Sequence, residues 1–345
     1  MTTPSMARRQ VSILDVARRA GVSTSTVSRS LRGADNVSEG TRHRVLQAAQ
    51  ELAYVPSPAA SRLVTGRTRT IAVIVPFASR WFFSEVVSGA ENALRVEGYD
   101  LLLYNIGDRA GRAHFFESLP LRRRVDAVLT VASAFTEAEQ VALVGLGLPI
   151  TMIGGQLTGF HRVGIDEEGS AATAVRHLVR LGHREVAMIS GDPDDPLGRA
   201  TTLARRAGFR RALTEAGIEE RRDHIVSEPW GISGGVRAME HLLSRARLPT
   251  AVFAESDEMA FGALQTLRRS GLDVPRHVSV IGFDDHEMAA AADLTTIAQP
   301  VYRQGELAAR MLLDALAGDR NLAVDVVLPT RLVVRGSTGA APEDC

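Results

Sequence analysis

The chain has 345 residues, 45% of them hydrophobic, so it is long enough for a small domain and a larger two-lobed one, each with its own buried core. The formal net charge of +0 by itself argues against a nucleic-acid partner, but residues 1–69 hold eleven Arg against four Asp or Glu. Basic charge concentrated at one end is typical of a DNA-reading head on a neutral or acidic body.

The sequence also argues against export and membrane insertion. The single cysteine, Cys345, cannot form an internal disulfide or a thiolate metal site, which fits a reducing cytoplasm. Arg8 and Arg9 are followed by alternating polar residues and not by the apolar run of a signal peptide. No stretch approaches the length of a membrane span. We therefore expect a cytoplasmic protein that has no membrane partner.

Three short helices are predicted in the first 55 residues. Ser12 and Asp15 are typical of a cap and its return partner, and Gly21 ends the first helix. Ser23 caps a second helix over residues 24–31. Two helices joined by a short turn containing Gly form a helix-turn-helix.

A third helix is predicted from its cap, Ser38, to near Tyr54, with Val45 and Ala48 on its apolar face. Pro56 and Pro58 then break the chain. The head is thus predicted to be a small three-helix domain followed by a linker.

From residue 71 onward, short apolar runs alternate with segments of helical period. Such runs are typical of strands buried on both faces of a parallel sheet. There are too many for one small sheet, so we predict an α/β core of two doubly wound parallel-sheet lobes, with a ligand between them at the carboxyl ends of the strands. The predicted strands are residues 71–75, 100–104, 127–131, 150–153, 186–189, 251–254 and 278–283, and the predicted helices are 83–96, 171–181, 204–216, 234–243, 258–269 and 305–317.

Residues 11–33 (VSILDVARRAGVSTSTVSRSLRG), 37–42 (VSEGTR) and 51–56 (ELAYVP) closely resemble the N-terminal signature of LacI/GalR transcription regulators. The resemblance continues through RRAGF, SDEMA and VIGFDD, at residues 205–209, 256–260 and 280–285, and reaches about residue 337. It implies a periplasmic-binding-protein-like core behind an all-α helix-turn-helix head. The predicted division is a head over 1–56, a hinge over 57–70, an N-subdomain over 71–180 and 301–328, and a C-subdomain over 181–300 and 329–345.

In a helix-turn-helix the second helix enters the major groove. Thr24, Ser25 and Arg29 are therefore expected to meet base edges, and Arg29 is the leading reader because Arg can bind guanine O6 and N7 bidentately. A solvated surface charge is the alternative for Arg29, and a simple helix cap for Ser23. The side chains expected to position the head on phosphates are Ser12, Ser23, Thr26, Ser28 and Asn36.

Residues 56–66 (PSPAASRLVTG) resemble the family's hinge, which implies a helix that forms on the operator. Ala60 matches its small packing residue and Leu63 its wedge, an apolar side chain that kinks DNA from the minor groove. Packing of Leu63 against the core is the alternative. The family usually has Asn where this chain has Ser57, but Pro58 suits a first helical position.

The resemblance also implies a ligand cleft, with Phe82, Phe83 and Trp81 near its mouth and Ser133 deeper. From the second lobe it implies Arg205, Trp230, Ser256, Asp257, Asp284 and Gln299. Carboxylates and Arg bond paired hydroxyls and aromatic rings cover the apolar face of a sugar, which favours a carbohydrate effector. Many sugar-responding members have Asn at Ser256, so the exact ligand stays open, with a purine or nucleoside as the alternative.

Structural roles compete with ligand contact at several of these positions. For Asp257, capping the following helix is as good an explanation as ligand contact, and for Trp230 and Phe83 ordinary core packing is the alternative. The acidic cluster at residues 166–168 is expected to complement the dipole of a helix that starts there.

Catalysis has no candidate constellation in the sequence. The histidines show no metal spacing, and no Gly-rich phosphate loop or nucleophile elbow is present, so neither a cofactor nor a metal is expected. A solute-binding protein is disfavoured by the basic head and the missing export signal, and a sugar-modifying enzyme by the missing nucleophile and acid/base pair. We therefore predict a homodimeric repressor of a palindromic double-stranded DNA operator, allosterically controlled by a small ligand. The tail after Ser337 lacks the leucine heptads of a tetramer.

Overall fold

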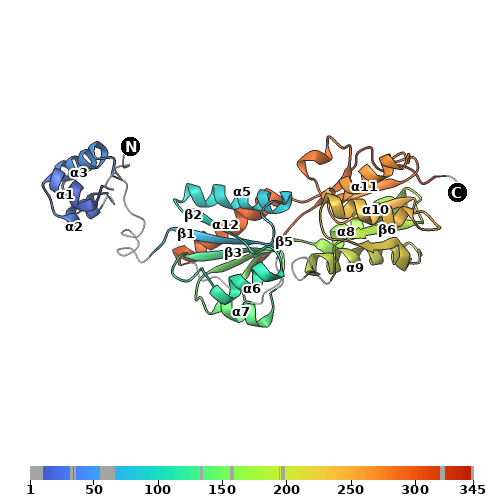
Figure 1. Cartoon of the computed structure of the whole chain (residues 1–345), viewed down its shortest axis with the longest axis horizontal. Coiled ribbons are helices and arrows are strands. Elements are labelled where there is room, and N and C mark those ends of the chain that lie inside the picture. Colours follow the sequence, from blue (N-terminus) through green and yellow to red (C-terminus); the bar gives the residue numbers. More distant parts are fainter. Residues whose placement is uncertain are drawn as a thin grey trace, which may run out of the picture. The chain divides into compact units, whose positions relative to one another are not determined.

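The computed structural model describes residues 11–31, 34, 36–54, 67–132, 135–155, 159–193, 195, 199–318 and 323–342. The chain divides into two compact units, Met1–Thr68 and Arg69–Cys345 (Figure 1). The predicted hinge residues Ala60 and Leu63, and Ser133 of the core, lie outside the described residues.

The first unit contains the three predicted helices, α1 (Ile13–Ala20), α2 (Thr24–Leu31) and α3 (Glu39–Glu51). Asp15 accepts hydrogen bonds from the backbone N–H of Ser12 (3.0 Å) and from its hydroxyl (2.7 Å), so Asp15 is the return partner that was predicted. Gly21 ends α1 at φ +66°, a conformation that favours glycine.

One apolar face of each head helix is buried. Val16 of α1, Val27 of α2 and Val45 of α3 are fully buried together in a small core. Ser38 precedes α3 as predicted, but its hydroxyl donates to the Thr41 hydroxyl (2.9 Å) and does not cap a helix N–H. Packing of the three apolar faces therefore holds the head together.

The second unit begins with a six-stranded sheet in the order β11-β5-β4-β3-β1-β2, and all its neighbouring strands are parallel. Successive residues of β1 face opposite sides, so that Val73 packs with α5 and α12 while Ile74 packs with α6 and α7. The strands are thus buried on both faces, as predicted. The elements of this first lobe are β1 (Thr70–Val75), α5 (Trp81–Val96), β2 (Asp100–Asn105), α6 (Arg109–Ser118), β3 (Ala127–Val131), α7 (Glu137–Val144), β4 (Ile150–Ile153), β5 (His161–Ile165), α12 (Val301–Ala317) and β11 (Asp325–Leu328).

The second lobe contains another six-stranded sheet, in the order β12-β10-β9-β8-β6-β7. Its strands are parallel except for β12, which pairs antiparallel with β10 at the edge. Helices α8 and α9 cover one face and α10 and α11 the other. The elements are α8 (Glu167–Arg180), β6 (Val186–Ser190), α9 (Arg199–Glu215), η1 (Arg222–His224), β7 (Ile225–Ser227), α10 (Ile232–Leu243), β8 (Ala251–Ala254), α11 (Asp257–Arg269), β9 (Ser279–Asp284), η2 (Glu287–Ala289), β10 (Thr295–Ala298) and β12 (Arg331–Val333).

The chain passes between the lobes after β5, after β10 and after β11. The predicted subdomain boundary at residue 180 is wrong, because α8 belongs to the second lobe. Figure 1 shows α8 beside β6 and α9 of the second lobe. Val175 and Leu178 of α8 pack in one core with Phe209 and Phe253. The first crossing therefore lies between β5 and α8, where the acidic cluster stands.

All seven predicted strands are present, and three of them, β3, β4 and β8, match to the residue. Several short elements were not predicted: β5, β7, β10, β11, β12, α6 and α7. None of the helices in the described ranges is both long and apolar enough to cross a membrane.

Candidate functional site

A cavity of about 550 Å³ lies between the two lobes. It is lined by residues at the carboxyl ends of strands from both sheets, including Pro76 after β1, Gly154 after β4, Asp166 after β5, Ser256 after β8 and Asp284 at the end of β9. Doubly wound sheets bind ligands at this edge, and the volume is typical of a site for a small molecule.

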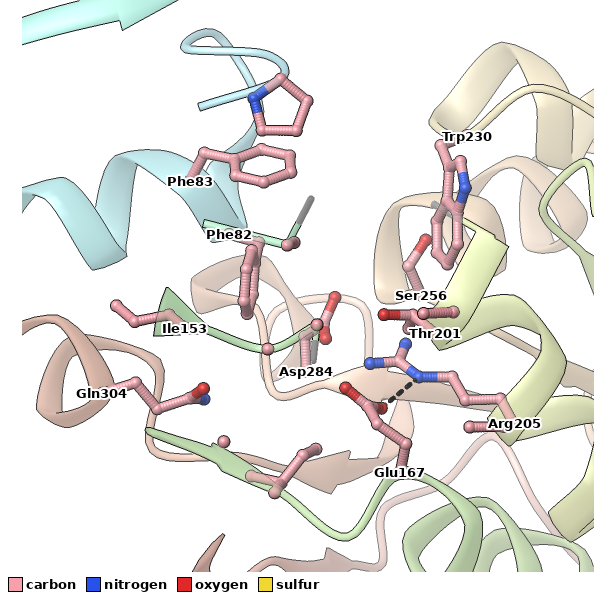
Figure 2. A pocket seen from close by; sticks show the side chains of 18 of the residues that line it. Phe82, Phe83, Ile153, Glu167, Thr201, Arg205, Trp230, Ser256, Asp284 and Gln304 are labelled. Carbon is pink, nitrogen blue, oxygen red and sulfur yellow. Dashed lines mark hydrogen bonds and ion pairs between the residues drawn. The ribbon is translucent and has the colours of Figure 1, made fainter. Parts of the chain in front are cut away.

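Aromatic side chains form opposite walls of the cavity. Phe82 and Phe83, in the first turn of α5, meet edge to face with ring centroids 5.3 Å apart. Trp230, before α10, faces them from the second lobe (Figure 2). Flat apolar surfaces of this kind suit the face of a sugar ring or a base.

Arg205 of α9 is held in place on several sides. Its Nε donates to Glu167 (2.8 Å), its Nη1 donates to the backbone oxygen of Glu255, and its guanidinium carbon lies 3.6 Å from the centre of the Phe283 ring. Burial opposes the charge of Arg205, but the nearby carboxylates, led by Glu167 and Asp284, outweigh it and raise its pKa. The guanidinium therefore stays charged and fixed in the cleft (Figure 2).

Asp284 ends the central strand β9 with an unusual backbone, at φ +124°. Its carboxylate accepts a hydrogen bond from Gln299 (2.6 Å), whose own amide oxygen accepts one from Gln304 (2.9 Å). Burial raises the pKa of Asp284 well above its usual range, although Arg205 opposes this. Backbone strain of this kind persists where the surroundings determine it, and it clusters at ligand sites.

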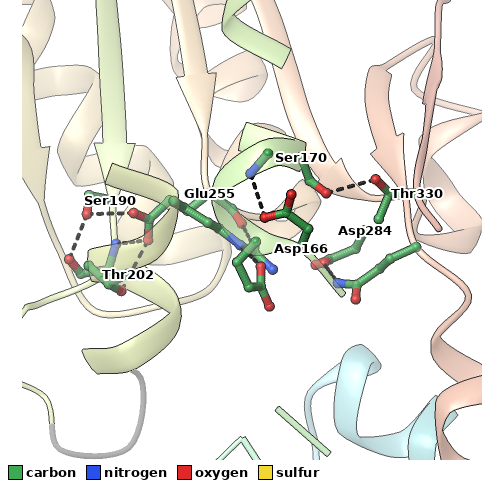
Figure 3. A network of polar contacts seen from close by, with 12 residues as sticks. Asp166, Ser170, Ser190, Thr202, Glu255, Asp284 and Thr330 are labelled. Atoms are coloured by element: carbon green, nitrogen blue, oxygen red, sulfur yellow. Dashed lines mark hydrogen bonds and ion pairs between the residues drawn. The ribbon is translucent and has the colours of Figure 1, made fainter. Parts of the chain in front are cut away.

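A buried carboxyl group that was not predicted from the sequence lies next to Arg205, away from the cavity. Glu255, directly after β8, is completely buried and accepts hydrogen bonds from the Ser190 hydroxyl (3.0 Å), the Gly191 N–H (2.9 Å) and the Thr202 hydroxyl (3.2 Å) (Figure 3). Burial raises its pKa to about 7. Glu255 thereby joins the end of β6 to the first turns of α9, the helix that carries Arg205.

Most of the predicted effector residues meet in this cavity. Those that line it are Phe82, Phe83, Arg205, Trp230, Ser256 and Asp284. Gln299 does not line it and instead supports Asp284 from behind. The sequence did not single out Arg80, Arg162, Glu258 or Gln304, which also line the cavity, and the acidic residues 166–168 were assigned only to the helix dipole.

Asp257 does not cap α11, so that explanation is wrong, and it is not among the described residues that line the cavity. Its buried carboxylate accepts hydrogen bonds from the His286 N–H (2.8 Å) and the Thr296 hydroxyl (2.7 Å), and so holds the loop after β9. Ser256 is the actual cap, since its hydroxyl accepts from the Met259 N–H (3.2 Å).

Two contacts join the lobes beside the cavity. Arg80, just before α5, forms an ion pair with Glu258 of α11 (3.1 Å), and both side chains are largely buried. Trp81 lies against the ring of His286, with centroids 4.8 Å apart. Burial lowers the pKa of Arg80, and Glu258 opposes this. The cleft is thus bridged by charge and by ring packing.

In the head, the polar side chains at and near the start of α2 form hydrogen bonds with one another and with nearby backbone groups. Ser23 accepts from the Thr26 N–H (3.2 Å), so it is a cap, and its hydroxyl also meets that of Ser25 (2.8 Å). Arg29 Nε donates to the backbone oxygen of Ser25 (3.2 Å). Ser23, Ser25 and Asn36 are exposed, whereas the predicted DNA contacts with intermediate exposure are Ser12, Thr24, Thr26, Ser28 and Arg29.

Among the residues that the structure describes, no group of three or more His, Cys, Asp or Glu side chains could hold a metal ion.

Family models match the head and a large part of the core. Residues 12–57 match the family model "Bacterial regulatory proteins, lacI family", and residues 175–338 match "Periplasmic binding protein-like domain". The fold and the two sites thus define a DNA-binding regulator with a ligand-binding core.

Two relatives are similar over nearly the whole chain. Catabolite control protein A of Priestia megaterium is 32% identical over 332 residues, which cover 95% of this chain and 99% of the relative. The HTH-type transcriptional repressor CytR of Escherichia coli K12 is 35% identical over 333 residues, which cover 95% and 96%. The chain belongs to the LacI family of bacterial regulatory proteins.

Solved structures agree with this assignment. The chain is similar to the lac repressor dimer bound to operator and the anti-inducer ONPF, with a TM-score of 0.85 and 27% sequence identity. The match covers 96% of this chain and 100% of the lac repressor chain. The complex of the transcriptional regulator CelR with cellobiose has a TM-score of 0.71 at 33% identity and covers 95% and 100%.

Proposed function

We propose that this regulator binds a palindromic operator as a homodimer and that a small carbohydrate in the cleft changes its affinity for the operator. The observation that carries the proposal is the cavity between the lobes, in which Arg205 and Asp284 lie opposite Phe82 and Phe83. Such a set can bond paired hydroxyls and cover the apolar face of a sugar ring.

The DNA side of the proposal rests on the head. A helix-turn-helix inserts the N-terminal side chains of its second helix into the major groove. α2 begins with the hydroxyls of Thr24 and Ser25, and Arg29 lies in its last turn with its Nε on the backbone oxygen of Ser25. Two heads are needed because a single one makes few base contacts. The solved lac repressor dimer on its operator supports this arrangement.

Coupling between the sites follows from the way the lobes meet. A ligand that contacts both lobes stabilises whichever relative position it fits best, and it shifts the population accordingly. The core begins with β1, which belongs to the first lobe, so a shift between the lobes moves this strand relative to the second lobe. An effector that favours the operator-binding form is a co-repressor, and one that favours the other form is an inducer. Coupling of this kind is typically about 1–3 kcal/mol.

A nucleoside or purine is the second candidate effector. Trp230 and Phe82 face each other across the cavity, and a flat base stacks between aromatic rings as readily as a sugar does (Figure 2).

We propose binding and not catalysis for the cleft. Its best-placed carboxylates are engaged, Glu167 with Arg205 and Glu258 with Arg80, which leaves them poorly suited to move protons. We also propose that the protein acts in the bacterial cytoplasm, at the nucleoid, because its relatives are bacterial transcription regulators.

Two measurements on the full-length protein test the proposal. Selection from a random duplex library should enrich a palindrome, and a thermal-shift screen with cellobiose, ribose, glucose, adenosine and hypoxanthine should raise Tm with at least one of them. The shift should vanish in Asp284→Ala and persist in Asp314→Ala, a matched change on α12 that does not line the cavity. Enrichment of no palindrome, or the same shift in Asp284→Ala, would contradict the proposal.

A further inference from the structure

The guanidinium groups that line the cleft are already committed to carboxylates. Among the described residues there are three, and each forms an ion pair. The pairs are Arg80 with Glu258 (3.1 Å), Arg162 with Asp325 (2.8 Å) and Arg205 with Glu167 (2.8 Å). Arg205 also lies against the Phe283 ring and donates to the backbone oxygen of Glu255. A ligand anion would have to compete with these partners.

Carboxyl groups outnumber the guanidinium groups in the same lining. The six acidic residues there are Asp166, Glu167, Glu168, Asp195, Glu258 and Asp284. Burial raises the pKa of Asp284, so this group is the one most readily protonated. Even with Asp284 neutral, five carboxylates of the described lining remain against its three guanidinium groups and Arg211, which pairs with Glu168 (2.6 Å). The described lining therefore carries a net negative charge.

Of the helix starts that border the cleft, those of α8 and α11 are also occupied, whereas α5 and α9 begin there without an acidic residue in the first turn. A helix N-terminus is a ready anion site because its first N–H groups are unpaired. At α8, the Asp166 carboxylate accepts from the Gly169 N–H (2.8 Å), and at α11 the Ser256 hydroxyl accepts from the Met259 N–H (3.2 Å). Acidic side chains fill the first turn of both helices. An incoming anion would meet negative charge at each of them.

We infer that the cleft selects against anions, so that the effector is an uncharged or cationic polyhydroxy compound or nucleoside and not its phosphate ester. The existence of an effector rests on the proposed function, whereas the charge selection is a property of the cleft itself. A phosphate group that formed an ion pair with Arg205 would leave Glu167 without its partner, and one that paired with Arg80 would do the same to Glu258. The unpaired carboxylate would then lie next to the phosphate in a partly buried site. The negative charge of a phosphate ester should weaken its binding by at least about tenfold relative to the uncharged parent compound.

Fluorescence quenching tests the charge of the cleft without a known effector. The chain has two tryptophans, Trp81 and Trp230, and only Trp230 lines the cavity. In a Trp81→Phe variant the emission of Trp230 can be quenched by caesium and by iodide at constant ionic strength, each relative to free N-acetyltryptophanamide. Caesium should be the better quencher. Better quenching by iodide would overturn the inference.

A matched pair of variants ties the result to the cleft. Glu258→Gln in the Trp81→Phe background removes the carboxylate that pairs with Arg80, whose guanidinium carbon lies 5.8 Å from the centre of the Trp230 ring. Iodide quenching should then rise. Glu117→Gln changes an exposed residue of α6 outside the cavity and should leave it unchanged. Equal effects of the two substitutions would count against the inference.

Ligand pairs complete the test. The test uses sets of compounds that differ mainly in charge. They are ribose and ribose 5-phosphate, adenosine and adenosine monophosphate, and glucose, glucosamine and glucose 6-phosphate. For any pair whose neutral member raises Tm, the phosphate should need at least about tenfold higher concentration for the same shift. A phosphate that binds as tightly as its parent overturns the charge selection. Preferential caesium quenching with no shift from any compound would confirm the charge selection and contradict the proposed function.

Discussion

The polar groups of the head and of the cleft are held in opposite ways. Among the described residues of the head, the side chains of Ser23, the cap of α2, and of Arg29 bond to neighbours two to four residues away and stay at least partly exposed. In the cleft, Arg205 is only 4% exposed and bonds to Glu167 and Glu255, 38 and 50 residues away along the chain. The head therefore keeps independent side chains available for an outside partner, whereas the cleft is a preorganised network whose members depend on one another.

The largest expected effect is that of breaking the cleft network. Arg205→Met removes the partner of Glu167 and a donor to the Glu255 backbone, and loss of a buried partner costs about 3–5 kcal/mol. Denaturant unfolding should show this loss, and the thermal shift with effector should disappear. Arg210→Met on the same helix breaks an exposed pair with Glu220 and should cost no more than about 1 kcal/mol. Equal losses in the two variants would mean that the cleft is not a coupled network.

Glu255 should make the stability of the core depend on pH. Because burial raises its pKa to about 7 in the folded protein, the folded state binds a proton that the unfolded state releases near pH 4.5. Stability therefore falls as pH rises from about 4.5 to 7, by about 3 kcal/mol in total.

Glu255→Gln, which resembles the protonated form, should match the wild type at pH 5 and exceed its unfolding free energy at pH 8. Urea titrations at the two pH values measure the difference. A Glu219→Gln variant, outside the buried network, serves as the control. If the difference in unfolding free energy between the wild type and Glu255→Gln were the same at both pH values, Glu255 would not be the group responsible for the pH dependence.

Arg29→Ala should affect recognition and leave stability nearly unchanged. As a bidentate guanine reader, Arg29 contributes about 1–3 kcal/mol of discrimination at one base pair per half-site. Binding to operators substituted at each position should lose its preference at that pair alone, with the unfolding free energy within about 0.5 kcal/mol of the wild type. Arg18→Ala, in the last turn of α1 with its side chain 78% exposed, provides the control. An equal loss on random DNA would show that Arg29 contacts only phosphate.

The smallest effect is expected at the bridge between the lobes. Arg80→Met and Glu258→Gln should each destabilise the core, and the double variant should cost less than the sum of the two, with a coupling energy of about 1 kcal/mol. Thermal or urea unfolding of the four proteins measures this cycle. Additive losses would mean that the ion pair does not join the lobes energetically.

The predicted elements that were found share a local cause. Buried parallel strands such as β3, β4 and β8 are continuous apolar runs, which a sequence displays directly. The missed strands do not. In β11 the residues alternate between exposed and intermediate positions at a sheet edge, and β10 is a buried strand written TTIA, in which two of the four residues are Thr. Helix α6 was missed because its sequence, RAGRAHFFES, is largely polar.

The residues of the chain by themselves determined the head helices, the buried strands and the chemistry offered to DNA and to a ligand, because caps, apolar periods and side-chain types act within a few positions. Only the tertiary structure decided that α8 joins the second lobe, that Asp257 turns away from the cavity, and that Glu255 lies buried behind Arg205. Arg80 and Glu258 are 178 residues apart, so nothing in their local sequence could show that they meet. Packing of two separate sheets brings such groups together, and this packing depends on the whole core.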